Sequence, residues 1–429
     1  MLDAWAQVLD GLYAHLPLKR ALYGFDPIRA LDHLRQQVPR LSHFEFHREL
    51  TNLINHLRDA HTQYSGPRTL TNAVAALPFL VENWGAPEDC HFVVSKVTNR
   101  RLVRDRYFVP GVTLDWWNGV PFNRAVDLHG EGETGGRPDS RKAAALESLT
   151  LRSLEYEPPP DEQWVTVGYT DLKGNKREVT FDWRVVIPDR APIASGRGGA
   201  VRVRRGIDPA AEARRRAKKL LFNAALWRAE QLQETRKPAS LTKKYSDVLT
   251  ALSVRTKSGT FGYLRIWSFD VDDDEEFIAA AIALLKPLPD SGIVVDLRDN
   301  PGGFIWAAER LLQLFTPNPI APTKFAFRAT PMTLAMSTAR MNQEEFGPWA
   351  DAIATAVSTD EPYSAHLPIT SIEQCNDVGQ HYGGPVVVVV DANTYGRRPQ
   401  RLQALFGPCG RRGHQDNNHG EQHLSMQHG

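Results

Sequence analysis

Two short and almost entirely apolar runs constrain the fold of this 429-residue chain more than any other feature. They occupy residues 292–297 and 385–390, and each has the length of a strand. Because neither run alternates between apolar and polar side chains, both are predicted to be strands buried on both faces. Each run ends in a polar, turn-prone segment, which is where open α/β sheets carry their chemistry. The sequence therefore predicts an α/β core with a site at these two strand ends.

Predicted elements around the two runs extend this core over residues 256–395. A strand is expected at 260–266, and helices are expected at 275–286 and 304–315. The acidic run 270–276 could bind a cation, but negative charge is also favourable at the start of a helix. We therefore interpret the run as a helix start, and we expect neither a metal nor a cofactor.

Two further regions precede this core. Residues 1–66 carry apolar positions at helical spacing and predict an N-terminal helical module. Residues 67–190 change to short β-rich runs broken by Gly and Pro, with one helix expected around 141–154. A tight turn is expected at 116–119. This pattern predicts a small β-rich binding domain.

Residues 191–255 predict a basic linker and an inserted helix. The helix is expected to start at Asp208-Pro209 and to run to about Thr235. Residues 197–219 contain nine Lys or Arg residues but only two acidic residues. This excess could bind nucleic acid or another anionic partner, or it could form a solvated helix face. Aromatic residues do not interleave the charges, which favours the solvated face and no nucleic-acid partner.

Composition excludes several classes of protein. The 51 Lys and Arg residues balance 50 Asp and Glu residues, so no global charge attracts nucleic acid or anionic lipid. Cys90, Cys375 and Cys409 lie far apart, which argues against a disulfide framework and favours a reducing compartment. No apolar run reaches about 18 residues, so no membrane span is expected. The N-terminus lacks the pattern of a signal peptide, and a cytoplasmic location is expected.

Three residues are candidates for chemistry. Gly302 and Gly303 follow the first apolar run and precede a predicted helix, so their turn could hold an oxyanion or a phosphate. The same Pro-Gly-Gly sequence could equally form a simple turn. His61 follows the N-terminal helices and could be a general base or a packed histidine.

The order and spacing of several segments resemble the S41 family of serine peptidases, which includes tail-specific or C-terminal processing peptidases and tricorn-like enzymes. The most specific of them reads DLRDNPGG at 296–303. The resemblance runs from the helical N-terminus to Tyr395. The other matching segments are Asp59–Thr62, the β-rich domain, Gly262–Ile266 and Pro385–Tyr395.

The resemblance implies a crotonase-like core, a PDZ-like domain that engages peptide or protein substrates, and hydrolysis of peptide bonds through an acyl-enzyme. In the PDZ-like stretch the matching features are residues 110–112 and 117–121. His61 matches the general base of members that use a serine nucleophile, and Gly302-Gly303 matches the oxyanion-hole loop. A hydroxyl nucleophile needs both a base and amide donors.

The sequence departs from this family pattern at Gly396. In such members the corresponding segment reads Thr-Tyr-Ser-Ala-Gly-Asp, with the serine as nucleophile, whereas glycine has no side chain that could attack a carbonyl. Residues 396–429 contain no Val, Ile, Thr, Tyr, Trp or Lys and could not supply buried strands. A zinc site in this tail fits no familiar ligand spacing. Its ligands would be Cys409, His414, His419 and His423.

We interpret the tail 396–429 as the product of a reading-frame change just after Tyr395. Gly-Arg-Arg-Pro can be encoded by bases that read Ala-Gly-Asp in a shifted frame, and the DNA around codon 396 tests this hypothesis. As written, the chain is predicted to have an incomplete core and no serine peptidase activity. The alternative is a pseudo-peptidase that binds peptides without cleaving them. The oligomeric state is not predicted.

Overall fold

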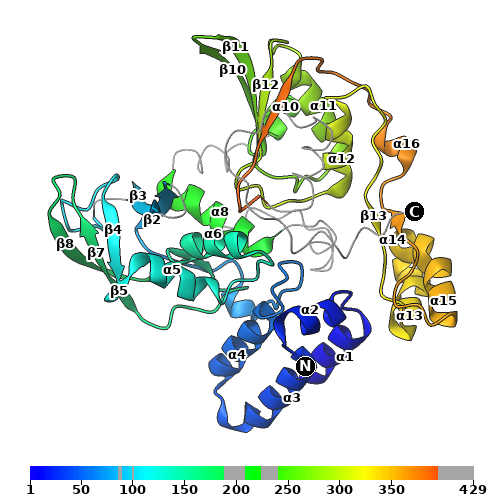
Figure 1. The fold of residues 1–429 in the computed structure, drawn as a ribbon, viewed down its shortest axis with the longest axis horizontal. Coiled ribbons are helices and arrows are strands. Elements are labelled where there is room, and N and C mark those ends of the chain that lie inside the picture. The colour runs from blue at the N-terminus through cyan, green and yellow to red at the C-terminus, as the bar shows by residue number, and fades with distance from the viewer. Residues whose placement is uncertain (86–88, 99–100, 188–207, 224–239, 395–429) are drawn as a thin grey trace.

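The computed structural model describes residues 1–85, 89–98, 101–187, 208–223 and 240–394. These residues form a mixed α/β structure with several sheets (Figure 1), which confirms the predicted α/β class. Within them, no helix combines the length and the hydropathy needed to cross a membrane.

The N-terminal helical module packs its helices around a small apolar core that includes Leu9, Leu31 and Ile54. Local sequence fixes two helix starts: Asp26 accepts hydrogen bonds from the amides of the following turn, and Ser42 forms a capping box with Glu45. The elements are α1 (Leu2–Gly11), α2 (Leu16–Tyr23), α3 (Pro27–Gln37), the 3-10 helix η1 (Val38–Arg40) and α4 (His43–Asn55).

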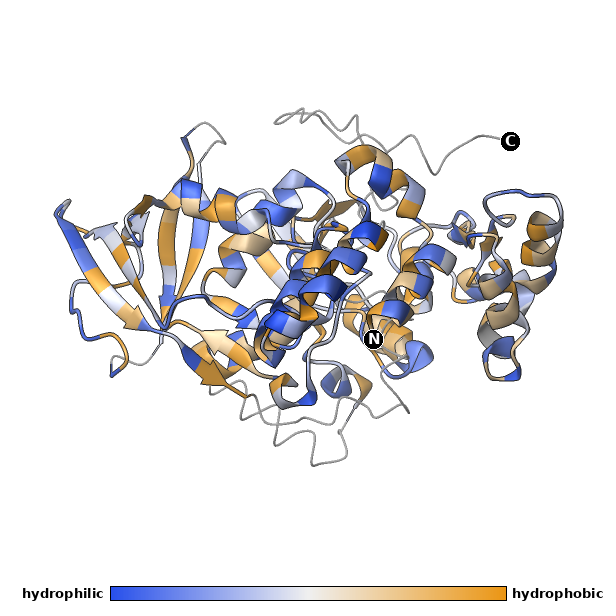
Figure 2. Cartoon of the chain, turned by 90° about the horizontal axis from the view of Figure 1, so that it is seen from below, coloured by the Kyte–Doolittle hydropathy of each residue, from blue (hydrophilic) through white to orange (hydrophobic). Residues whose placement is uncertain are grey.

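The middle β region is an antiparallel sheet with the strand order β2-β3-β4-β7-β8, and its strands alternate between hydrophilic and hydrophobic residues (Figure 2). The predicted tight turn is present, with Asn118 and Gly119 at φ values of 47° and 78°. Aromatic rings such as Phe79 and Phe108 fill the core beneath the sheet. The strands are β2 (Phe79–Trp84), β3 (His91–Val97), β4 (Thr113–Trp117), β5 (Val120–Pro121), β7 (Trp164–Thr170) and β8 (Lys176–Asp182).

Two helices pack against this sheet, α5 (Phe122–Gly130) and α6 (Pro138–Ser148). The helix expected around 141–154 is therefore shorter, because its last predicted residues form β6 (Leu151–Ser153). β6 joins a second, three-stranded antiparallel sheet. The other elements there are η2 (Arg68–Leu70), β1 (Val74–Ala76) and β9 (Arg184–Val186).

The inserted helix is α8 (Pro209–Phe222), which packs against β6 and β1 through Ala217 and its neighbours. Asp208 caps its N-terminus as predicted. The helix ends at Phe222, and the rest of the expected helix lies outside the described residues. The prediction that its basic face is solvated is wrong for Arg214, whose side chain is only 3% exposed.

The core sheet has the strand order β10-β11-β12-β15, in which β11, β12 and β15 run parallel. Their C-terminal ends therefore meet at one edge, as the two apolar runs predict. An apolar cluster beneath the sheet includes Leu264, Phe277 and Leu311. The elements are α10 (Leu241–Lys244), β10 (Leu249–Thr256), β11 (Gly259–Ile266), α11 (Asp274–Leu285), β12 (Ile293–Asp296), α12 (Ile305–Gln313) and β15 (Val386–Val389).

The two apolar strands differ in burial. β12 is buried through Ile293 and Val295, as predicted. The prediction that β15 is buried on both faces is wrong, because Val387 is 54% exposed. The reason is that β15 is the edge strand in the described part of the sheet. Exposed apolar residues of the core sheet are thus found at β15 and not at β12.

A helical arm, residues 324–368, follows α12 and precedes β15 along the chain. It extends from the core to the N-terminal module (Figure 1). Thr330 Oγ1 donates a 2.7 Å hydrogen bond to the carbonyl of Gly11, and the Tyr363 hydroxyl donates one of 2.7 Å to the carbonyl of Ala14. Core, arm and module are therefore joined. The arm and the residues after it contain β13 (Lys324–Phe325), α13 (Pro331–Thr338), η4 (Arg340–Asn342), α14 (Gln343–Phe346), η5 (Gly347–Trp349), α15 (Ala350–Ser358), β14 (Leu367–Pro368) and α16 (Ile372–Cys375).

Candidate active site

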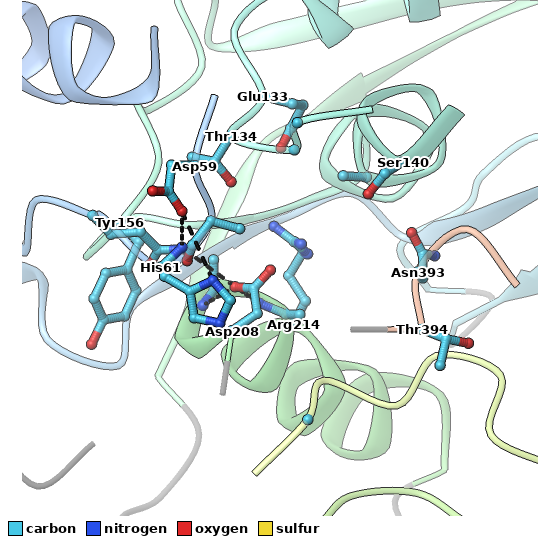
Figure 3. A pocket seen from close by; sticks show the side chains of 18 of the residues that line it. Asp59, His61, Glu133, Thr134, Ser140, Tyr156, Asp208, Arg214, Asn393 and Thr394 are labelled. Atoms are coloured by element: carbon cyan, nitrogen blue, oxygen red, sulfur yellow. Dashed lines mark hydrogen bonds and ion pairs between the residues drawn. The ribbon is translucent and has the colours of Figure 1, made fainter. Parts of the chain in front are cut away.

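All these regions line one large cavity of about 3040 Å³. Its walls contain His61, Gly302 and Gly303, so the structure brings the described candidate residues to the same cavity. Figure 3 shows His61 beside Asp59 and Asp208, with Asn393 and Thr394 across the cavity from them. The predicted nucleophile position, Gly396, and the tail ligands considered for zinc, Cys409, His414, His419 and His423, lie outside the described residues.

The turns after β12 and β15 are bound to each other. The backbone N–H of Asp299 donates to the carboxylate of Asp391 at 3.1 Å, and Asn393 Nδ2 donates to Asp299 Oδ1 at 3.0 Å. Thr394 Oγ1 donates to the carbonyl of Leu297 at 3.0 Å. We call these two segments, 297–303 and 391–394, the paired turns. The two polar segments at the predicted strand ends therefore lie in contact with each other.

The Gly302-Gly303 turn needs glycine for two reasons. Both residues have positive φ values, 90° and 136°. A Cβ atom on Gly303 would lie 2.1 Å from the carbonyl carbon of Phe269. The chain passes this closely because the N–H of Phe269 donates to the carbonyl of Gly302, and the N–H of Phe304 donates to the carbonyl of Phe269, at 2.8 Å each.

The two glycine amides have different partners. The N–H of Gly302 donates to Asn300 Oδ1 at 2.8 Å, so it is already used. Within the described residues, the N–H of Gly303 makes no hydrogen bond. Asn300 is buried and its Nδ2 donates to the carbonyl of Ile266 at 3.0 Å, which anchors the turn to the end of β11. Of the two predicted oxyanion donors, Gly302 therefore has a partner among the described residues.

His61 lies on the loop after α4 with its side chain 58% exposed. Its backbone N–H donates to Asp59 Oδ1 at 2.9 Å, and its Nδ1 lies 3.8 Å from the same oxygen. Asp59 is itself held by the hydroxyl of Tyr13, which donates to Oδ2 at 2.9 Å. The loop therefore presents the imidazole to the cavity with a fixed carboxylate beside it.

Asp208 connects the two candidate loops. Its side chain accepts hydrogen bonds from Gln63 Nε2 at 3.4 Å and from the amide of Ala210 at 3.0 Å. Its own N–H donates to the carbonyl of Pro301 at 3.0 Å. The Asp-Pro sequence predicts only a helix cap, so sequence analysis missed this connection. It requires two loops that are far apart along the chain to meet.

Buried charges form the cavity wall beside α8. Arg214 donates from Nε to Glu147 Oε2 at 2.9 Å and also pairs with Glu157. Lys218 pairs with Glu147 as well. Burial alone would raise the pKa of Glu147, but the charges of Lys218 and Arg214 outweigh it and lower that pKa to about 2. This pairing explains why Arg214 is buried and not solvated.

Glu133 adds a second kind of carboxyl group to this wall. Burial, with the Glu157 carboxylate adding to it, raises the pKa of Glu133 to about 7. The hydroxyl of Ser148 donates to Glu133 and lies 2.7 Å from His129 Nε2. Ser148 is 1% exposed, so almost none of it is accessible to solvent. We call Glu133, Glu147, Glu157, Arg214 and Lys218 the charged wall.

The acidic run 270–276 forms a helix start, as interpreted from the sequence. Asp273 accepts the amide of Glu276 at 2.9 Å, and Asp274 pairs with Arg310 at 2.7 Å. In the described part of the chain, no group of three or more His, Cys, Asp or Glu side chains could hold a metal ion. Cys90 and Cys375 form no disulfide with a described residue.

Two comparisons with known proteins find similar proteins. Residues 260–396 match the model of peptidase family S41. The structure is similar to that of mature CPAF, with a TM-score of 0.58 and 18% identity over 91% of this chain and 77% of that chain. A serine-to-alanine mutant of CPAF and mature CPAF complexed with lactacystin each give a TM-score of 0.56 at 17% identity, over 91% of this chain and 78% of theirs.

Comparison with curated protein sequences finds no match. The likeness to CPAF shows a shared fold, and the family model matches the segment that carries the paired turns and the core strands β11, β12 and β15. Residues 260–396 of this chain thus carry the sequence pattern of peptidase family S41.

Proposed function

We propose that the chain binds peptide or protein substrates in its central cavity with the apparatus of a serine-type S41 peptidase. In this proposal His61 is the general base and the Gly302-Gly303 turn forms the oxyanion hole. Residues 67–190 act as the PDZ-like domain that engages the substrate, and residues 256–395 are a crotonase-like core.

The observation that carries this proposal is the connection through Asp208. A base and an oxyanion donor act together only when both face the same carbonyl group. Asp208 contacts Gln63, two residues after His61, and Pro301, one residue before Gly302. Both loops line the same cavity. This geometry supports a site built for acyl transfer.

The proposal includes that this chain does not complete hydrolysis. Gly396 stands where the family pattern has serine, and an acyl-enzyme needs a side-chain nucleophile. Removing one member of a catalytic triad typically leaves only the small residual rate supplied by binding and oxyanion contacts. The frame-change hypothesis for 396–429 accounts for the loss.

A second candidate is a non-catalytic peptide-binding pseudo-peptidase. The observation that favours it is that the paired turns, the Gly303 turn and the His61 loop are all formed in a chain with glycine at 396. Peptide binding needs these surfaces but no nucleophile.

One experiment separates these functions. The purified chain and its Gly396→Ser variant are treated with a fluorophosphonate probe, and binding of fluorescent peptides is measured by polarisation. We expect saturable peptide binding and no labelling of the chain as written. Labelling of the variant alone indicates a peptidase that lacks only its nucleophile. Binding without labelling of either protein favours the pseudo-peptidase, and labelling of a core serine in the original chain contradicts the proposed inactivity.

A further inference from the structure

A histidine pair lies outside the cavity, on the first turns of α4. His43 and His47 are four residues apart, a spacing that places both side chains on one helix face. Their Nε2 atoms are 3.1 Å apart, and the two rings meet edge to face with centroids 4.4 Å apart. His43 is exposed and His47 is half-buried, so solvent reaches the point between the two nitrogens.

This separation suits two ligands of one metal ion. Zinc binds histidine nitrogens at about 2.0–2.1 Å, so two nitrogens at angles between square and tetrahedral lie about 2.9–3.4 Å apart. The Nε2 separation of 3.1 Å falls inside this range. The spacing is also that of the two histidines in the HExxH zinc helix. The helix backbone therefore already holds both nitrogens where a chelated ion needs them.

Tyr64 fixes the orientation of the second ring. Its hydroxyl is hydrogen-bonded to Nδ1 of His47, and its ring stacks on that imidazole with an interplanar angle of 10°. Metal-bound histidines typically use their other ring nitrogen in such a bond, because it sets the tautomer and the ring orientation.

We propose that His43 and His47 chelate a divalent transition-metal ion of the zinc class, with Tyr64 holding the ring of His47. The described residues offer no third protein ligand within one group, so water completes the coordination. This site is independent of the proposed peptidase function. It is nevertheless joined to the active-site loop, because Tyr64 lies three residues after His61.

The test is position-resolved chemical modification of the untagged full-length chain. Histidines are modified with diethylpyrocarbonate, with and without ZnCl₂, and each peptide is quantified by mass spectrometry. Resolution by position is needed because the sequence carries further histidines at 414, 419, 423 and 428. We expect Zn²⁺ to slow modification of His43 and His47 several-fold. Mg²⁺, which prefers oxygen ligands, should have no effect.

Controls separate chelation from a change in folding. His33 and His56 lie in the same module and should be modified at the same rate with and without Zn²⁺. His43→Ala removes the exposed ligand and should abolish protection of His47, while Tyr64→Phe should weaken zinc binding about tenfold. Protection of His47 that persists in His43→Ala, or equal rates with and without Zn²⁺ in the original chain, overturns the proposal.

Discussion

The paired turns and the charged wall line the same cavity, yet different contacts hold them. The paired turns depend on backbone geometry, with glycine at positive φ and short hydrogen bonds to main-chain groups. The charged wall depends on ion pairs between side chains of α6, α8 and the loop after β6. Single substitutions should therefore lower the free energy of unfolding most in the wall, where removing one charge leaves its partner buried without a counter-charge.

The largest effect is expected from Arg214→Ala. It leaves Glu147 and Glu157 buried without their common partner, which should lower the free energy of unfolding by about 3–5 kcal/mol. Urea unfolding measures this change. The control is Arg35→Ala, whose side chain is 45% exposed and whose loss should cost less than about 1 kcal/mol. Equal costs for the two variants would remove the distinction between wall and surface.

The wall should also make stability depend on pH. Because the pKa of Glu133 is raised from 4.5 to about 7, the folded chain holds this proton more tightly than the unfolded chain. The resulting stabilisation is complete below pH 4.5 and is lost as the pH rises to about 7, by roughly 3 kcal/mol. Glu133→Gln keeps a neutral side chain and should remove this decline. Unfolding curves from pH 4.5 to 8 that are parallel for the two proteins would contradict the assignment.

In the paired turns, the sharpest test is Gly303→Ala. The added Cβ would overlap Phe269, and the backbone is strained as well, so we expect a loss of about 2–3 kcal/mol. Gly119→Ala has the strain alone, because no atom lies within 4 Å of its Cβ position, and should cost about 1 kcal/mol. Thermal or urea unfolding that ranks Gly119→Ala as the costlier variant would show that the close approach is not rigid.

Asp208 connects the charged wall to the paired turns, because it caps α8 and donates to the carbonyl of Pro301. Its substitution tests this connection. Asp208→Ala removes a helix cap and the bond from Gln63, for an expected cost of about 1–2 kcal/mol. Asp208→Asn retains a capping oxygen and should cost less. Peptide polarisation should show weaker binding for the alanine variant than for the asparagine variant. Unchanged peptide affinity in both variants would show that Asp208 caps the helix but does not contribute to peptide binding.

The smallest change in stability is expected at the exposed edge of the core sheet. Val387→Lys should change the free energy of unfolding by less than about 0.5 kcal/mol, because this side chain is half exposed. An exposed apolar edge strand favours association, and a lysine there opposes it. Light scattering at increasing concentration should therefore show less aggregation of the variant. Unchanged aggregation would show that the chain associates through a surface other than β15.

Local signals account for what the sequence predicts correctly. The apolar runs of β12 and β15, the polar turns that follow them and the Gly302-Gly303 turn are all written in a few adjacent residues. The Asp208-Pro209 helix start is equally local. These signals also carry the family resemblance.

Distant partners account for what the sequence missed. Arg214 reads as a surface cation until Glu147 and Glu157, which lie more than fifty residues away along the chain, come to meet it. The exposure of Val387 depends on which strand lies beside β15, and no feature of the valine run itself reports that. Likewise, the four-residue spacing of His43 and His47 indicates a metal site only once Tyr64 is seen to stack on the ring of His47.

The bonds between the helical arm and the N-terminal module have an evolutionary consequence. Arg328 and Thr330 of the arm donate to the main-chain carbonyls of Asp10 and Gly11, at the end of α1 where a helix leaves carbonyls without partners, and Tyr363 donates to the carbonyl of Ala14 in the turn that follows. Every amino acid carries such a carbonyl. Substitution on the acceptor side therefore leaves the carbonyls in place, although a side chain at Gly11 would press on Met332 of the arm. Substitution of the donor side chains of the arm removes the bonds themselves.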